Sequence, residues 1–165
     1  MMVALARLAT RAMPSRYTKY VDTVLEFSGD AGVTSFDLRR HLSATDVAVL
    51  AGELGVGPPF AVITAHNPDG IGQSTEQNAA AERRLRDVVA QRGLAHRLAD
   101  GLDPARTHRE AALAVMTPLA EARALASEFG QDAIFWFEGR RFWLVGVADD
   151  FAARLPLQRG PDHSP

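Results

Sequence analysis

The 165-residue sequence contains no cysteine. This absence excludes disulfide bonds, zinc sites built from thiolates and a cysteine nucleophile. It also fits a protein of the reducing cytoplasm, which is the location that we predict.

The sequence also lacks a basic excess and a long apolar run. Its formal net charge is −2, whereas broad nucleic-acid binding normally needs a basic face. No stretch approaches the roughly 18 consecutive apolar residues of a membrane-spanning helix. We therefore expect neither nucleic acid nor a membrane as a general partner. The composition, with 47% hydrophobic and 23% charged residues, is typical of a globular domain with a substantial core.

The two ends of the chain differ from its middle. Residues 1–16 show no periodic apolar face, and we expect them to be a disordered extension, with translation starting at Met1 or Met13. Residues 156–165 are rich in proline and polar side chains, which predicts a flexible tail. Between them, residues 17–155 are expected to form a single α+β domain.

The middle of the chain is divided clearly by turn residues. Residues 21–27 and 35–39 predict a hairpin, and a helix follows from Ser43 to Gly55. From there the pattern predicts the order β-α-β-β-α-β-β, with elements at 60–65, 74–92, 94–99, 111–116, 117–129, 132–137 and 141–147. This is a ferredoxin-like β-α-β-β-α-β order with an added C-terminal strand, and it predicts helices on one face of a largely antiparallel sheet.

The stretch FAVITAHNPDG, residues 60–70, marks the candidate site. A buried strand ends there in polar and turn residues, just before a helix whose capping box begins at Ser74. Helix N-termini offer unsatisfied N–H groups, and glycines let a backbone approach a ligand closely, so a cradle for an anion or polar group is one interpretation. The other is ordinary turn chemistry of Asn-Pro-Asp-Gly.

Sequence order places further polar residues near this loop. Asn78 continues the apolar stripe of the helix towards the loop, so we expect it to be buried and hydrogen-bonded. If strands 60–65 and 111–116 are antiparallel neighbours, Asn67 and Glu110 lie at the same edge of the sheet. Gln131 begins the strand after the last helix and reaches the same edge if that strand is antiparallel to residues 60–65.

The combination of ITA-x-NP, Ser74, Asn78, an acid before a strand and FGQ-x-AI is similar to a bacterial family of small uncharacterised proteins, domain of unknown function 3293. The resemblance covers roughly residues 58–147. It implies positions and no chemistry, and its signature falls on Thr64, Asn67, Pro68, Ser74, Asn78, Glu110, Gly130, Gln131 and Ala133. The chain departs from the family pattern at His66 and His108, where tryptophan is usual, and at Asp132, where asparagine is common.

Three classes of function fit this cluster. The first is binding of a small polar or nucleotide-like molecule by Thr64, Asn67, Ser74, Asn78 and Gln131. The second is a hydrolase or transferase in which Glu110, His108 or His66 is the general base. The third is a non-catalytic interaction module in which the polar network is structural and the Trp136/Trp143 hairpin is the contact surface.

No motif for a cofactor or metal accompanies the cluster. The sequence has no P-loop, Rossmann fingerprint or HExxH motif. His66, Asp69, His108 and Glu110 match no standard metal-ligand spacing. We expect no cofactor and no metal, and the sequence leaves open both the oligomeric state and whether the protein is an enzyme.

Overall fold

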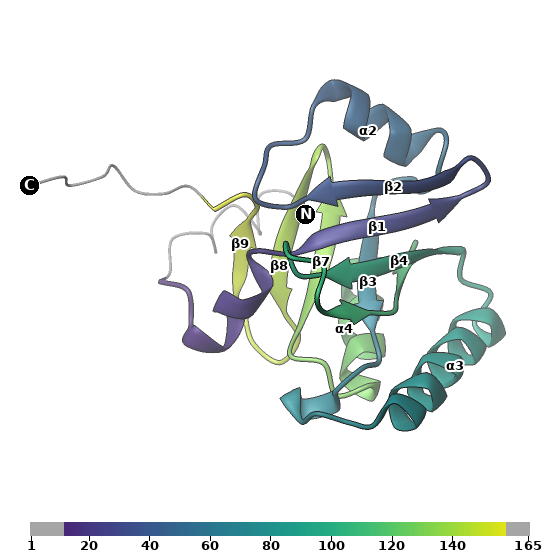
Figure 1. Ribbon diagram of the computed structural model, residues 1–165, viewed down its shortest axis with the longest axis vertical. Coiled ribbons are helices and arrows are strands. Elements are labelled where there is room, and N and C mark those ends of the chain that lie inside the picture. The colour runs from purple at the N-terminus through teal and green to yellow at the C-terminus, as the bar shows by residue number, and fades with distance from the viewer. Residues whose placement is uncertain (1–11, 158–165) are drawn as a thin grey trace, which may run out of the picture.

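The computed structural model describes residues 12–157 (Figure 1). In this part of the chain nine strands form one antiparallel sheet in the order β2-β1-β4-β6-β3-β7-β8-β9, with β5 paired to β4. The strands are β1 (Val24–Gly29), β2 (Gly32–Asp37), β3 (Phe60–Thr64), β4 (His96–Leu102), β5 (Arg109–Glu110), β6 (Ala112–Val115), β7 (Ala133–Glu138), β8 (Arg141–Gly146) and β9 (Ala152–Arg154). The α-helices are α2 (Ala44–Ala51), α3 (Thr75–Gln91) and α4 (Leu119–Glu128), and the short 3₁₀ helices are η1 (Ser15–Tyr20) and η2 (Pro68–Gly70).

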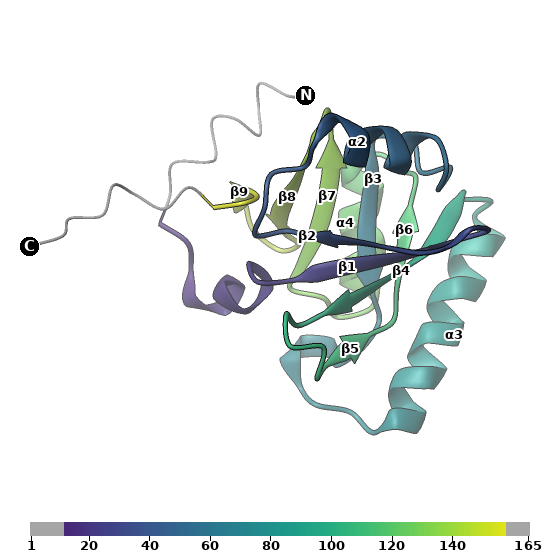
Figure 2. The ribbon, with the colours of Figure 1, turned by 45° about the horizontal axis from the view of Figure 1, so that its top comes forward.

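The sheet is strongly curled. In Figures 1 and 2, β1 and β2 cross the direction of β3, β7 and β8. The turn occurs along β4, which pairs with β6 through residues 96–98 and with β1 through residues 99–102. The predicted single α+β domain is confirmed, but its architecture is a curled, half-barrel-like sheet of nine strands, and a ferredoxin-like order is not shown.

The two helices of the predicted arrangement, α3 and α4, lie on one face of the sheet as expected, and η1 and α2 cover the other face. On one face, α3 and α4 pack through residues such as Leu85 and Leu125 against Trp136. On the concave face, η1 and α2 contribute Tyr17 and Leu50 to a second core. The physical reason is visible in β3, where residues 60–63 are all buried and therefore need cover on both sides.

The tryptophan hairpin belongs to the core. Trp136 and Trp143 are cross-strand neighbours in β7 and β8, and both are buried. This removes the contact surface that the interaction-module interpretation required, because side chains buried in this way are not available to a partner.

The boundaries of some predicted segments move. The first hairpin is present, but its strands extend to Gly29 and Gly32 and only Asp30 and Ala31 form the turn. Of the predicted N-terminal extension, residues 1–11 lie outside the described residues, whereas Ser15 and Arg16 begin η1. Of the predicted tail, residues 158–165 lie outside them.

The strand directions that bring the candidate site together are confirmed. β3 is antiparallel to β6, with Thr64 opposite Ala112, and antiparallel to β7, with Val62 opposite Phe135. The end of β3, the start of β6 and the start of β7 therefore lie side by side at the same end of the strands.

Candidate functional site

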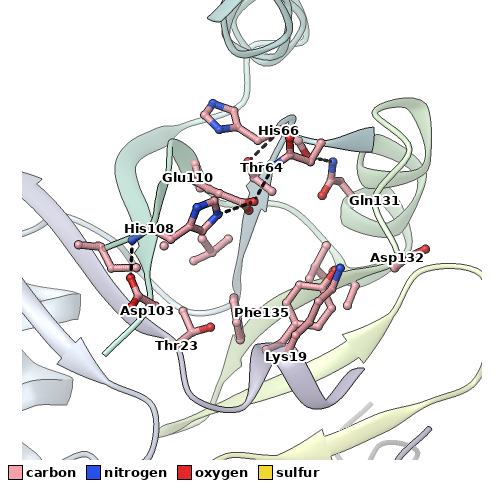
Figure 3. Close-up of a pocket in the computed structure, with 18 of the residues that line it drawn as sticks. Lys19, Thr23, Thr64, His66, Asp103, His108, Glu110, Gln131, Asp132 and Phe135 are labelled. Carbon is pink, nitrogen blue, oxygen red and sulfur yellow. Dashed lines mark hydrogen bonds and ion pairs between the residues drawn. The ribbon is translucent and has the colours of Figure 1, made fainter. Parts of the chain in front are cut away.

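A cavity of about 460 Å³ opens where these strand ends meet, on the concave side of the sheet (Figure 3). Its apolar part is formed by side chains of the strands, including Leu25, Val62, Phe135 and Leu144. Its polar part lies where β3, β5 and β7 begin or end, and its lining there includes Thr64, His66, Asn67, His108, Glu110 and Gln131. Six of the eight predicted site residues thus line one pocket.

Asn67 is the centre of the polar network. Its backbone is left-handed, with φ 48° and ψ 56°, a conformation that asparagine tolerates better than most residues. Its side-chain oxygen accepts hydrogen bonds from the Gln73 N–H at 3.0 Å and from Asn78 Nδ2 at 3.1 Å. Its amide Nδ2 donates to Glu110 Oε1 at 3.0 Å. The loop after β3 is therefore fixed both to α3 and to β5.

Asn78 of α3 forms hydrogen bonds with Asn67 and does not itself line the pocket. Its Oδ1 accepts the backbone N–H of Asn67 at 2.9 Å, in addition to the bond between the two side chains. The predicted hydrogen bond to the 66–74 loop is confirmed, and Asn78 is half-buried rather than fully buried.

Replacing Asn78 with leucine should lower the free energy of unfolding by about 1–3 kcal/mol, because it leaves the Asn67 N–H and side chain without their partner. Chemical denaturation measures the effect. Asn78→Asp, which keeps the acceptor for that N–H, should lose less; equal losses for the two variants would contradict the role of the acceptor.

Glu110 projects from β5 towards the pocket (Figure 3). Its Oε1 is 3.0 Å from Asn67 Nδ2 and 3.2 Å from His108 Nε2, and its side chain is 28% exposed. The same turn is stabilised by Asp103, whose carboxylate accepts the His108 backbone N–H and the Thr107 hydroxyl. The first of these hydrogen bonds is the main cause that holds the pKa of Asp103 below its usual value.

Gln131 and Thr64 use their hydrogen-bond donors within the protein. Gln131 Nε2 donates to the carbonyls of His66 at 3.1 Å and Phe129 at 3.0 Å. The Thr64 hydroxyl donates to the Ala111 carbonyl at 2.8 Å and accepts the His66 N–H. The Thr64 side chain therefore links the end of β3 to the residue before β6.

Besides Asn78, two of the predicted residues direct their side chains away from the pocket. Ser74 is exposed and forms a capping box with Gln77, so its groups serve the end of α3. The ring of His66 points towards α3, where its Nε2 lies 4.0 Å from Glu82 Oε2 (Figure 3). That nitrogen is buried and has no hydrogen-bond partner among the described residues.

Gly130 explains part of the sequence signature. Its φ is +63°, and a Cβ built on it would lie 2.9 Å from Pro68 Cβ. Its carbonyl accepts the Asp69 N–H at 2.7 Å. The end of α4 and the loop after β3 therefore touch backbone to backbone, which only glycine allows here.

Residues 63–134 match the family described as Protein of unknown function (DUF3293). The resemblance seen in the sequence is thereby confirmed. The matched segment includes the residues from Thr64 to Ala133 on which the resemblance rests, and with them the loop after β3 and the contact between Pro68 and Gly130. The comparisons found no match among curated proteins and none among solved structures.

Several residues that line the pocket escaped the sequence analysis. Lys19 and Tyr20 come from η1, and Thr23 and Asp103 from segments that only the curl of the sheet brings here. Phe135 could have been found, because alternation along β7 puts it on the same face as Phe137 and opposite to Trp136. No local signal marks the others.

Two further observations bear on the class of site. Within residues 12–157 no three His, Asp or Glu side chains gather in a way that could hold a metal ion. None of the helices in that range is long and apolar enough to cross a membrane.

Proposed function

We propose that the protein binds a small molecule in the pocket at the end of β3, with Glu110 as the group that anchors it. The observation that carries the proposal is the position of Glu110, which is held by Asn67 and His108 at the polar end of a cavity of about 460 Å³. A pocket that is mostly apolar and contains a few fixed polar groups is the usual form of a small-molecule site.

Binding is favoured over catalysis by the state of the nucleophiles and bases. The Thr64 hydroxyl is committed to the Ala111 carbonyl, and the His66 ring faces α3. Neither side chain presents a free group to the pocket. Glu110 itself retains one carboxylate oxygen, Oε2, that accepts no hydrogen bond from the described residues.

A thermal-shift screen with nucleosides, amino acids, small amines and divalent metals tests the proposal. A compound that binds should stabilise the native protein in proportion to its concentration over its Kd. Glu110→Gln should abolish that shift while the melting temperature of the free protein changes little. Glu82→Gln is the matched control, because Glu82 has a similar side-chain exposure of 24% and lies outside the pocket. If Glu110→Gln mainly lowers the stability of the free protein, by about 1–3 kcal/mol, the network is structural and the proposal fails.

The distance of 3.2 Å between His108 Nε2 and Glu110 Oε1 supports one second candidate, a hydrolase or transferase in which this pair supplies the general base. The His108 side chain is 64% exposed and is free to meet a substrate. In that case His108→Gln should abolish turnover of a substrate and leave its binding intact, whereas a pure binding protein should show no turnover to lose.

A further inference from the structure

The polar side of the pocket offers acceptors. Both hydrogen bonds recorded for the Gln131 amide nitrogen go to backbone carbonyls, and the Asn67 amide nitrogen donates to Glu110. Among the described residues, Gln131 Oε1 and Glu110 Oε2 accept no hydrogen bond. A ligand that reaches this side meets oxygen atoms that need donors, because the protein has used its own amide donors internally.

The charge of the lining agrees with this hydrogen-bond pattern. Its four carboxylates are Asp22, Asp103, Glu110 and Asp132, and its one lysine or arginine is Lys19. None of the four carboxylates forms an ion pair with a lysine or arginine of residues 12–157. Lys19 also lines the pocket, and its Nζ lies 4.9 Å from the centroid of the Tyr20 ring and 3.9 Å from the place of a Cβ on Gly70. The titratable groups of the lining besides Glu110 are thus Lys19, Tyr20, the two histidines and the three other acids.

The rest of the pocket is suited to an apolar body. Tyr20 of η1 and Phe135 of β7 both line it and meet edge to face, with ring centroids 6.3 Å apart. Leu25, Val62 and Leu144 add aliphatic surface. Aromatic faces attract cations, and the face of Tyr20 already carries the Lys19 ammonium, 4.9 Å from the ring centroid.

We infer that the ligand is an organic cation: a protonated amine or amidine that donates to Glu110 and Gln131 and carries an apolar, ring-sized body. This inference rests on the proposed function and gives it a chemical class. It departs from the anion cradle considered for the loop before α3, since the Ser74 side chain and the neighbouring N–H groups are occupied by the capping box and by Asn67.

Three probes of the same shape and different charge separate the possibilities: 2-phenylethylamine, 2-phenylethanol and 3-phenylpropionate. Titrations of the full chain at pH 7, followed by ligand-observed NMR, should give a Kd for the amine at least about tenfold lower than for either of the others. Glu110→Gln should remove most of this preference by weakening the binding of the amine. Glu82→Gln should preserve the preference.

The outcomes distinguish the inference from the proposal beneath it. Tighter binding of the carboxylate, or equal binding of the amine and the alcohol, contradicts a cationic ligand. Either result still agrees with the proposal that the pocket binds a small molecule. A preference for the amine that survives Glu110→Gln also overturns the inference, because the anchor would then lie elsewhere. If none of the three probes binds at millimolar concentration and the thermal-shift screen is also negative, the proposed function itself fails.

Discussion

Replacing Gly130 with alanine should destabilise the protein by about 2–4 kcal/mol, because two penalties act at the same residue. The backbone there has a positive φ of +63°, which is strained for any residue with a side chain. The added methyl group would also meet Pro68 Cβ at 2.9 Å and Asp69 N at 3.3 Å, so the loop after β3 would have to move. Urea denaturation of the two proteins measures the difference.

Gly93 provides the control for this substitution. It also has a positive φ, of +64°, but a Cβ placed on it would meet no atom within 4 Å. Gly93→Ala should therefore show the backbone penalty alone, about 1 kcal/mol. Similar losses at both glycines would mean that the close contact with Pro68 carries no energy. Gly130→Ala should also weaken binding in the pocket, since Asn67 precedes Pro68 directly.

Replacing Glu26 with glutamine should lower the free energy of unfolding at pH 7 by about 2–3 kcal/mol. Glu26 is a buried carboxylate of β1, with 7% of its side chain exposed, and it binds Arg106, Arg109 and Ser35. Removing one member of a buried ion pair is costly, although here both arginines are half exposed and can be hydrated again. The exposed pair of Arg92 and Glu128 is the comparison, and Glu128→Gln should change stability by less than about 1 kcal/mol.

The effect of Glu26 should depend on pH in one direction. Burial alone would raise the pKa of Glu26, but hydrogen bonds from Arg106, Ser35 and Arg109 outweigh it and hold the pKa below its usual value. A carboxyl group with a lowered pKa stabilises the native state above its unfolded pKa, about 4.3, and this contribution is lost as the pH falls through the folded pKa. The difference between the wild-type protein and Glu26→Gln should therefore shrink below about pH 4. A difference that is constant from pH 7 to pH 3 would contradict the ion pairs as its cause.

The sequence was a good guide wherever structure is set locally. The capping box of Ser74 and Gln77 predicted the start of α3, and Glu138-Gly139 predicted the hairpin of β7 and β8. Strand order then brought Asn67, Glu110 and Gln131 to one pocket, because antiparallel neighbours fix which ends meet.

What the sequence could not indicate depends on contacts between distant segments. The direction of the His66 ring depends on where α3 packs, and the curl along β4 depends on which strands cover its two halves. The ion pairs of Glu26 join residues about 80 positions apart in the chain. No local pattern of side chains encodes such distances.

The order of strands in the sheet makes the pocket a property of the whole domain. The family match ends at residue 134, yet Lys19, Tyr20, Leu25 and Leu144 form part of the lining. A fragment restricted to residues 63–134 would leave β4 without β1 and most of the β7–β8 hairpin missing, which would expose unpaired strand edges that promote aggregation. Under the proposed function, a ligand in the pocket would contact both halves of the sheet, and its binding would stabilise the two halves together against unfolding.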